Sequence, residues 1–153
     1  MPHFEIVNTL PSEATEVLES SLREFNRERN PEFWQARELL GNAASPLSVF
    51  ARSNDNRVIG ALTAETQFKW LRISLMSVLP DLRRQGIGAK IVQLAEQEAI
   101  RRGCTYAYVD TLDYQAPDFY KRLGYNQVGK LDDWDSHGHA KLFFVKRLAA
   151  TLD

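Results

Sequence analysis

The sequence contains one cysteine, no long apolar run and no excess of charge of either sign. Cys104 alone cannot close an internal disulfide, and no signal-peptide pattern precedes the first helix signals, so we expect a reducing, cytoplasmic setting. No segment approaches the roughly 20 apolar residues needed to span a bilayer, which excludes a membrane partner by this criterion. With 19 Lys and Arg against 20 Asp and Glu, the chain lacks the cationic surplus that nucleic-acid binding draws on.

What remains is an ordinary globular composition, with 44% hydrophobic and 25% charged residues over 153 positions. A chain of this length buries roughly 70% of the surface that its unfolded form exposes, so it needs no disulfide or metal to hold a core. Internal repeats, low-complexity tracts and linkers are absent from the sequence. We therefore expect a single domain over residues 1–153.

The first half of the chain is predicted to form strands and two helices, the second of which is short. Residues 3–10 alternate like a strand, Ser12 is a plausible N-cap for a helix with an apolar stripe, and a second helix starts at Pro31 and ends before Gly41. Residues 48–80 read as three strands, the first two joined by a turn at residues 53–56. Their connections are too short for crossover helices, so these strands must be antiparallel.

The second half alternates helices and strands. The helix after Pro80 has an apolar face formed by Ile87, Ile91, Leu94, Ala95 and Ala99, and Gly103 is its expected C′ residue. Because a helix separates them, residues 105–111 should form a strand parallel to the one before it. A short helix ending at Gly124 and strands over residues 125–131 and 139–148 complete the chain.

Two glycines at the start of the helix after Pro80 raise the question of a ligand. Each glycine in a helix costs roughly 0.5–1 kcal/mol relative to alanine, so Gly86 and Gly88 are a poor choice for stability alone. Without side chains there, the free first-turn N–H groups form an anion site suited to a pyrophosphate, with Arg83 and Arg84 as added donors. The alternative is that the glycines only let the helix pack closely against the sheet. The Walker pattern is absent, and the Rossmann pattern fails because Ile91 replaces its third glycine.

The segment "VLPDLRRQGIGAKIV" resembles the coenzyme A signature of the GNAT superfamily of N-acetyltransferases. That signature, an Arg or Gln, two residues, Gly, one residue, then Gly or Ala, is matched at Arg83, Gly86 and Gly88. A second signature, Asn-x-x-Ala-x-x-Phe-Tyr followed by Leu-Gly-Phe/Tyr, is similar to "DYQAPDFYKRLGY". It matches at Ala116, Phe119, Tyr120, Leu123, Gly124 and Tyr125 and departs at Asp113, where Asn is usual.

The resemblance implies an α+β fold: a mixed sheet of six to seven strands, mostly antiparallel, with a splayed parallel pair in the middle and about four flanking helices. The pantetheine arm of acetyl-CoA, the implied co-substrate, would lie in the gap of that pair; no metal is implied. A backbone N–H near Val78 would polarise the acetyl carbonyl. The cofactor-binding residues implied are Met76, Ser77, Val78, Arg83, Arg84, Gln85, Gly86, Ile87, Gly88, Ala89, Asp113, Ala116 and Phe119.

Acetyl transfer to an amine needs a proton donor and a proton acceptor. The resemblance places Tyr120 at the thiol of coenzyme A, where a phenol, protonated at pH 7, would protonate the leaving thiolate; the alternative is a packing aromatic. An alkyl amine with a pKa near ~10.4 must lose a proton, directly or through water, to Glu65, Asp110 or Asp113. Each has a structural alternative: an exposed strand position for Glu65, a loop hydrogen bond for Asp110 and a helix cap for Asp113.

The acceptor side is predicted from aromatic and acidic residues. The resemblance implies that Phe33 and Trp34 wall the acceptor site, although they could equally cover the core. The loop of residues 131–139, with Asp133 and Trp134, would form the opposite wall and favour a cationic amine; a solvated hairpin tip is as good an interpretation. His137 and His139 in that loop are too few for a metal site and are read as a polar turn.

These observations predict an acetyl-CoA-dependent N-acetyltransferase that acts by direct transfer in a ternary complex. A small-molecule amine is favoured because the chain has no long extra binding segment. Two alternatives stay open: a protein N-acetyltransferase, and a non-catalytic acyl-CoA-binding sensor. Edge strands near the C-terminus could also pair across a homodimer.

Overall fold

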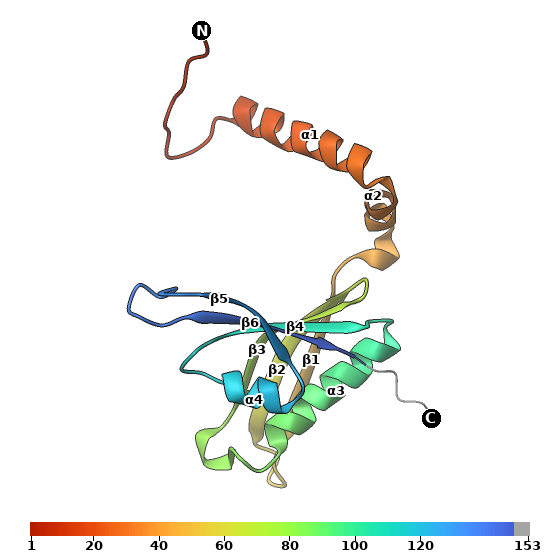
Figure 1. Ribbon diagram of the computed structural model, residues 1–153. Coiled ribbons are helices and arrows are strands. Elements are labelled where there is room, and N and C mark those ends of the chain that lie inside the picture. The colour runs from red at the N-terminus through yellow and green to blue at the C-terminus, as the bar shows by residue number, and fades with distance from the viewer. Residues whose placement is uncertain (149–153) are drawn as a thin grey trace. The chain divides into compact units, whose positions relative to one another are not determined.

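The structure, a computed structural model, describes residues 1–148 (Figure 1). It divides into two compact units, Met1–Ala43 and a second unit that starts at Ala44, and each is described by itself. The single domain expected over residues 1–153 stays a prediction. No helix in the described part of the chain is long and apolar enough to cross a membrane.

The N-terminal unit contains α1 (Ser12–Arg29), α2 (Pro31–Glu38) and the 3-10 helix η1 (Leu40–Asn42). The strand predicted at residues 3–10 is wrong: these residues are exposed and form neither helix nor strand. Alternation is only half of what a strand needs, because its backbone must also be paired.

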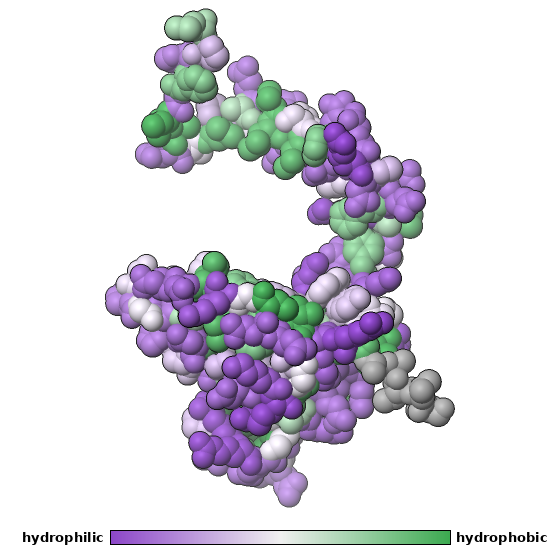
Figure 2. Space-filling view, in the orientation of Figure 1, coloured by the Kyte–Doolittle hydropathy of each residue, from purple (hydrophilic) through white to green (hydrophobic). Residues whose placement is uncertain are grey.

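Capping differs between the two helices of this unit. Ser12 is not the N-cap of α1, since the carbonyl of Pro11 already accepts the N–H of Thr15 at 2.9 Å and makes Pro11 the cap. For α2, Pro31 takes the first helical position, as predicted, and the side chain of Asn30, for which no role was predicted, accepts the N–H of Phe33. The apolar stripe of α1 lies on the surface, where Figure 2 shows green residues along this helix.

The second unit is built on one six-stranded sheet with the order β1-β2-β3-β4-β6-β5. The only parallel neighbours among the described strands are β3 and β4, and all other pairs are antiparallel. The predicted α+β fold with a mixed sheet is therefore confirmed. The strands are β1 (Ser45–Arg52), β2 (Val58–Gln67), β3 (Trp70–Val78), β4 (Tyr106–Leu112), β5 (Asn126–Leu131) and β6 (Lys141–Arg147).

The parallel pair parts soon after it forms. Trp70, Leu71 and Arg72 of β3 pair with β4, and no later pair joins these two strands in the described part of the chain. Just beyond Arg72 the register between β2 and β3 shifts at Thr63/Ala64, so that β3 carries an extra residue at Ser74. A bulge bends and twists its strand, which gives a physical reason for β3 to leave β4 at this point.

One face of the sheet carries both remaining α-helices, α3 (Ile87–Arg101) and α4 (Pro117–Arg122) (Figure 1), and the 3-10 helix η2 (Pro80–Leu82) precedes α3. The apolar face of α3 packs on the core, with Ile91, Ala95 and Ala99 almost fully buried. Leu94, predicted on that face, is instead 41% exposed. Gly103 follows the helix with φ +91°, as expected of a C′ residue.

Candidate active site

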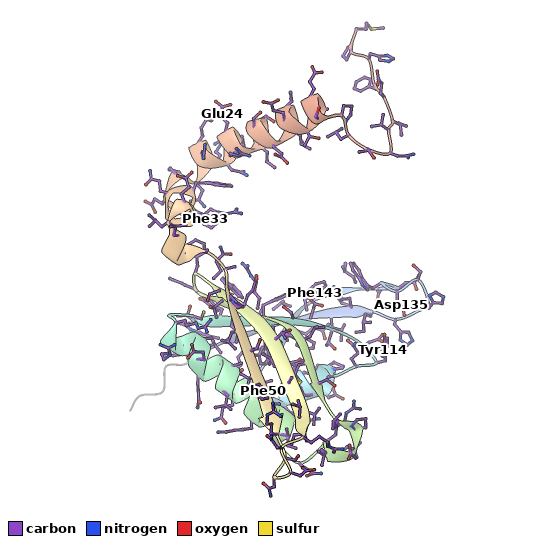
Figure 3. The ribbon with its side chains drawn as sticks, turned by 180° about the vertical axis from the view of Figure 1, so that it is seen from behind. Glu24, Phe33, Phe50, Tyr114, Asp135 and Phe143 are labelled. Carbon is purple, nitrogen blue, oxygen red and sulfur yellow. The ribbon has the colours of Figure 1, made fainter. Side chains whose placement is uncertain are left out.

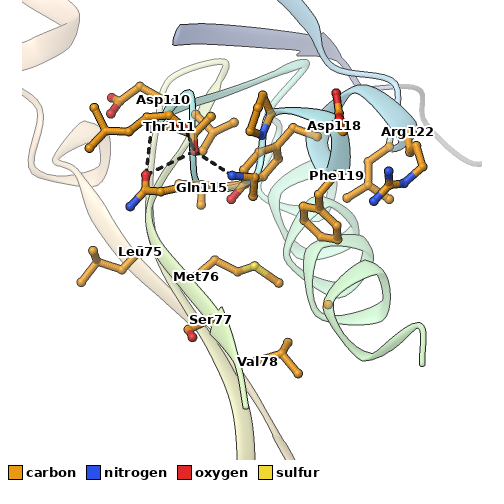
Figure 4. Close-up of a pocket in the computed structure, with 18 of the residues that line it drawn as sticks. Leu75, Met76, Ser77, Val78, Asp110, Thr111, Gln115, Asp118, Phe119 and Arg122 are labelled. Carbon is orange, nitrogen blue, oxygen red and sulfur yellow. Dashed lines mark hydrogen bonds between the residues drawn. The ribbon is translucent and has the colours of Figure 1, made fainter. Parts of the chain in front are cut away.

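The splay of β3 and β4 opens a cleft of about 1200 Å³ in the second unit (Figure 4). Its walls are β3 from Ile73 to Val78, the start of α3, the C-terminal end of β4 and the loop that leads into α4. The volume exceeds the roughly 300–1,000 Å³ of a typical small-molecule pocket. A ligand larger than a simple metabolite therefore fits.

The N-terminus of α3 forms one end of the cleft. Gly86 is the N-cap with φ +80°, and Arg84 before it also has a positive φ of 62°. No side chain of the described residues caps this helix, so the first-turn N–H groups of residues 87–89 keep their donor capacity. A left-handed arginine is a strained choice, of the kind that clusters at ligand sites. This end suits an anion.

The two glycines play different parts. A Cβ on Gly86 would have no heavy atom within 4 Å, whereas a Cβ on Gly88 would lie 2.8 Å from Cε of Met76 and 3.3 Å from the ring of Phe119. Gly88 thus lets α3 approach β3 and α4 closely, which is the packing interpretation. Gly86 instead provides the left-handed turn that exposes the helix end.

The predicted cofactor residues gather in the cleft, except for Gln85 and Ile87, which do not line it. The Nε of Arg83 donates to the carbonyl of Val78 at 3.1 Å, so this arginine also fixes the end of β3. The side chain of Gln85 turns back to the carbonyl of Asp81 at 3.5 Å. Ile87 packs against the hydrophobic core.

Tyr120, on α4, lies between the core and the cleft. Its side chain is 5% exposed and packs against the rings of Phe119, Tyr125 and Phe144. Burial first, and the charge of Asp110 second, raise the pKa of Tyr120 to about 12. Its hydroxyl has no hydrogen bond to any described residue, yet no fully buried side-chain oxygen in that part of the chain lacks a partner. The hydroxyl therefore reaches the open cleft, which Tyr120 lines.

The three candidate bases have different surroundings. Asp110 lines the cleft, accepts the hydroxyl of Tyr108 at 3.0 Å and pairs with Lys141 at 3.3 Å. Glu65 does not line it and forms a cross-strand ion pair with Arg72 at 3.4 Å.

Asp113, the third candidate, lines the cleft but does not cap α4, whose N-cap is Ala116. Its carboxylate accepts the N–H of Ala140 and contacts Nδ1 of His139, both at 2.9 Å. The Ala140 hydrogen bond is the main cause that lowers the pKa of Asp113. A stabilised carboxylate is a weaker proton acceptor, so this position is the poorer base.

The carboxylates of the acidic loop between β5 and β6 are bonded to N–H groups of the loop or to a lysine beside it. Asp133 accepts the N–H of Gly138 at 2.7 Å, and Asp135, at the tip in Figure 3, accepts the N–H groups of residues 137 and 139. Asp132 pairs with Lys130 at 2.7 Å. Trp134 alone in this loop lines the cleft among the described residues, with Nζ of Lys141 4.5 Å from its ring centroid.

The other predicted acceptor residues, Phe33 and Trp34, lie on α2 in the N-terminal unit. Their rings meet edge to face with centroids 5.8 Å apart, and the guanidinium of Arg37 lies over Trp34. Their role at the acceptor stays a prediction.

Several residues that line the cleft were not predicted. The side-chain oxygen of Gln115 accepts the N–H of Leu112 at 2.9 Å, and the hydroxyl of Thr111 contacts Gln115 and the N–H of Ala116 (Figure 4). These bonds shape the turn that delivers α4 to the cleft. Lys141 was also missed: alternation separates it from the buried Leu142 and Phe144, but the register that puts it on the face of Asp110 is seen only in the structure.

The sequence of this chain is similar to those of known acetyltransferases. The model of the acetyltransferase (GNAT) family matches residues 12–125. Acetyltransferase Atu2258 of Agrobacterium fabrum is 38% identical over 101 residues, covering 66% of this chain and 73% of the relative. Blasticidin-S acetyltransferase of Streptomyces morookaense is 32% identical over 117 residues, covering 74% and 86%.

Solved structures share the fold as well. An aminoglycoside 6′-N-acetyltransferase in complex with coenzyme A superposes with a TM-score of 0.64 over 90% of this chain and 94% of that one. Its sequence is 19% identical, so this likeness concerns the fold.

Proposed function

The chain belongs to the acetyltransferase (GNAT) family, and on that basis we propose that it transfers the acetyl group of acetyl-CoA to the amine of a small molecule. One similar protein supports a small acceptor, because its name specifies blasticidin S. The balanced reaction converts acetyl-CoA and an amine into an acetamide and free coenzyme A.

The observation that carries the proposal is the cleft between β3 and β4. It joins the N-terminus of α3 at one end to the hydroxyl of Tyr120 and the carboxylate of Asp110 along its other walls. One cleft thus provides an anion site, strand backbone, a proton donor and a proton acceptor. Acetyl transfer from a long phosphorylated carrier requires each of these.

The donor set of the cleft fits coenzyme A. Backbone N–H groups of residues 84–89 and the side chain of Arg84 would hold the pyrophosphate, for which a helix N-terminus is a suitable site. Beyond Arg72, β3 has lost its β4 partner, so backbone groups on that side are free to pair with pantetheine amides. When bound, acetyl-CoA supplies an acetyl group activated as a thioester.

The residues of this chain then carry out the proton transfers. A backbone N–H near Val78 polarises the acetyl carbonyl and strengthens its hydrogen bond as negative charge develops on the oxygen. Asp110, a candidate base that lines the cleft, accepts the proton of the amine, directly or through water. Tyr120 donates its proton to the departing sulfur, since its raised pKa keeps it protonated at neutral pH.

The experiment that tests this function combines binding and turnover. Calorimetry measures acetyl-CoA binding, and release of free thiol is followed with polyamines, aminoglycosides, nucleoside antibiotics, amino acids and peptides. Thiol release with a small amine supports the proposal, and release only with peptides replaces it with protein acetylation. Binding without turnover on any amine identifies a sensor and refutes transfer.

A further inference from the structure

A buried polar cluster lies next to Tyr120, outside the cleft, where it joins α3, β6 and Tyr125, the residue before β5. Glu96 of α3 is 9% exposed, and its carboxylate pairs with Nζ of Lys146 at 2.8 and 3.0 Å. Oε1 of Glu96 also accepts the hydroxyl of Tyr125 at 2.9 Å. None of these three residues lines the cleft.

Burying the charged groups of this cluster costs free energy of folding. A buried carboxylate must be paired and hydrogen-bonded, and an apolar trio of similar volume would often be as stable or more so. Burial, followed by the charge of Glu96, raises the pKa of Tyr125, so its hydroxyl stays a donor throughout the working pH range. Stability alone is therefore a weak reason for this arrangement.

The cluster fixes the hydroxyl of Tyr125 by a hydrogen bond, and the ring of Tyr125 packs against the ring of Tyr120. The ring of Tyr125 meets that of Tyr120 edge to face, with centroids 5.6 Å apart. Its backbone N–H donates to the carbonyl of Tyr120 at 3.0 Å, and its hydroxyl is anchored on Glu96. Tyr125 is thus fixed at both ends.

Tyr120 has no anchor of its own. Its hydroxyl makes no hydrogen bond within the described residues, so packing, with three neighbouring rings among the contacts, sets where that hydroxyl lies in the cleft. Among the three rings, only that of Tyr125 carries a polar group tied to the cofactor-side helix α3. A displacement of about 1 Å at a reacting group can cost as much as 10²-fold in rate, so this support matters for catalysis.

We propose that Tyr125, held by Glu96 and Lys146, is the positioning residue that places the Tyr120 hydroxyl for proton donation. The proposal rests on the acid role of Tyr120 in the function proposed above. Tyr125 acts through Tyr120 and touches no substrate.

A double-mutant cycle tests this link. Tyr125→Phe keeps the ring and the backbone hydrogen bond but loses the anchor to Glu96, and we expect kcat to fall at least about threefold with KM for acetyl-CoA unchanged. In a Tyr120→Phe background the same change should have no effect on kcat, since no proton donor remains to be placed. Tyr106→Phe is the matched control, because Tyr106 stacks on Trp70 away from the cleft.

The outcomes separate the two proposals. Loss of activity in Tyr120→Phe with normal kcat in Tyr125→Phe overturns the positioning role and leaves the acid role intact. Equal losses from Tyr125→Phe in both backgrounds also overturn it, because the residue then acts independently of Tyr120. Normal kcat in Tyr120→Phe refutes the acid role, and the positioning role falls with it.

Two further measurements guard against a trivial loss of folding. Glu96→Gln still accepts the Tyr125 hydroxyl and should retain kcat within about twofold, whereas Glu96→Leu should lose it as Tyr125→Phe does. NMR of ¹³C-labelled tyrosine reads the ring-flip rate of Tyr120 without any turnover. We expect faster flips in Tyr125→Phe than in the wild type; equal rates, or equal kcat in the two Glu96 variants, would contradict the proposal.

Discussion

Replacing Tyr120 by phenylalanine removes one hydroxyl and almost nothing else. The ring is 5% exposed and its contacts with Phe119, Tyr125 and Phe144 are retained. The hydroxyl makes no hydrogen bond to a described residue, so no buried partner is orphaned by its loss. We therefore expect the free energy of unfolding to change by less than about 0.5 kcal/mol.

The effect on catalysis should be much larger. General acid catalysis contributes typically 10²–10⁴-fold, so kcat should fall at least about tenfold, equivalent to roughly 1.4 kcal/mol or more in the barrier. The affinity for acetyl-CoA should stay the same, because the hydroxyl acts on the departing sulfur rather than on the bound ground state.

The assay is a single-turnover measurement under saturating acetyl-CoA, with melting temperature and calorimetric affinity recorded on the same preparation. A reduced rate of the chemical step, with normal melting and binding, is the expected result. A rate equal to that of the wild type makes Tyr120 a packing residue and assigns proton donation to water or another group.

Further changes test other parts of the account. Gly86→Asn, which tolerates a positive φ, should weaken acetyl-CoA binding at least about tenfold by calorimetry with little change in melting temperature, and unchanged affinity removes the pyrophosphate from this helix end. Trp134→Ala should raise KM for the amine severalfold and spare that for acetyl-CoA; if neither constant moves, the loop is a hairpin tip. Because burial raises the pKa of Tyr120 to about 12, its proton should persist as pH rises past 10; a fall in the rate of the chemical step with a midpoint near 10 that is absent in Tyr120→Phe contradicts this. Arg102→Met loses hydrogen bonds to Pro46 and Thr66 and should lower the free energy of unfolding, measured by urea denaturation, by about 1–3 kcal/mol. The KM values for acetyl-CoA and the amine should stay the same; a change in either would give Arg102 a role at the site.

Much of the sheet unit could be predicted from the sequence because local signals agree with the tertiary structure there. Helices and strands end or begin next to residues that favour turns, namely the segment 53–56, Pro80, Gly103 and Gly124. The parallel direction of β3 and β4 followed from the helix between them, whereas their splay followed only from the family resemblance. Residues 3–10 alternate equally well, yet no local signal reveals that they are left without a strand partner.

The site could be predicted only in part, because side-chain partners depend on register and on loop conformation. Glu65 lies between the buried residues Ala64 and Thr66, so alternation points it away from the core, but its pairing with Arg72 required the register of β2 and β3. The sequence reveals three carboxylates in the acidic loop, but only the structure reveals that each of them has a bonding partner nearby.

The cluster next to Tyr120 was hidden for a similar reason. Glu96 and Lys146 are separated by 50 positions and meet only through the tertiary fold, in which β6 lies next to β4 in the sheet. Helical spacing places Glu96 beside Val92 and Ala99, but no local signal reveals that Lys146 and Tyr125 meet it there.

The most direct test of acetyl transfer uses acetyl-CoA labelled in its acetyl group. The protein is incubated with this label and each small amine of the panel, and the amine and the coenzyme A are both analysed by mass spectrometry. We expect a labelled acetamide on the nitrogen of at least one small amine, with an equal amount of free coenzyme A. Bound acetyl-CoA that stays intact with every amine would contradict it.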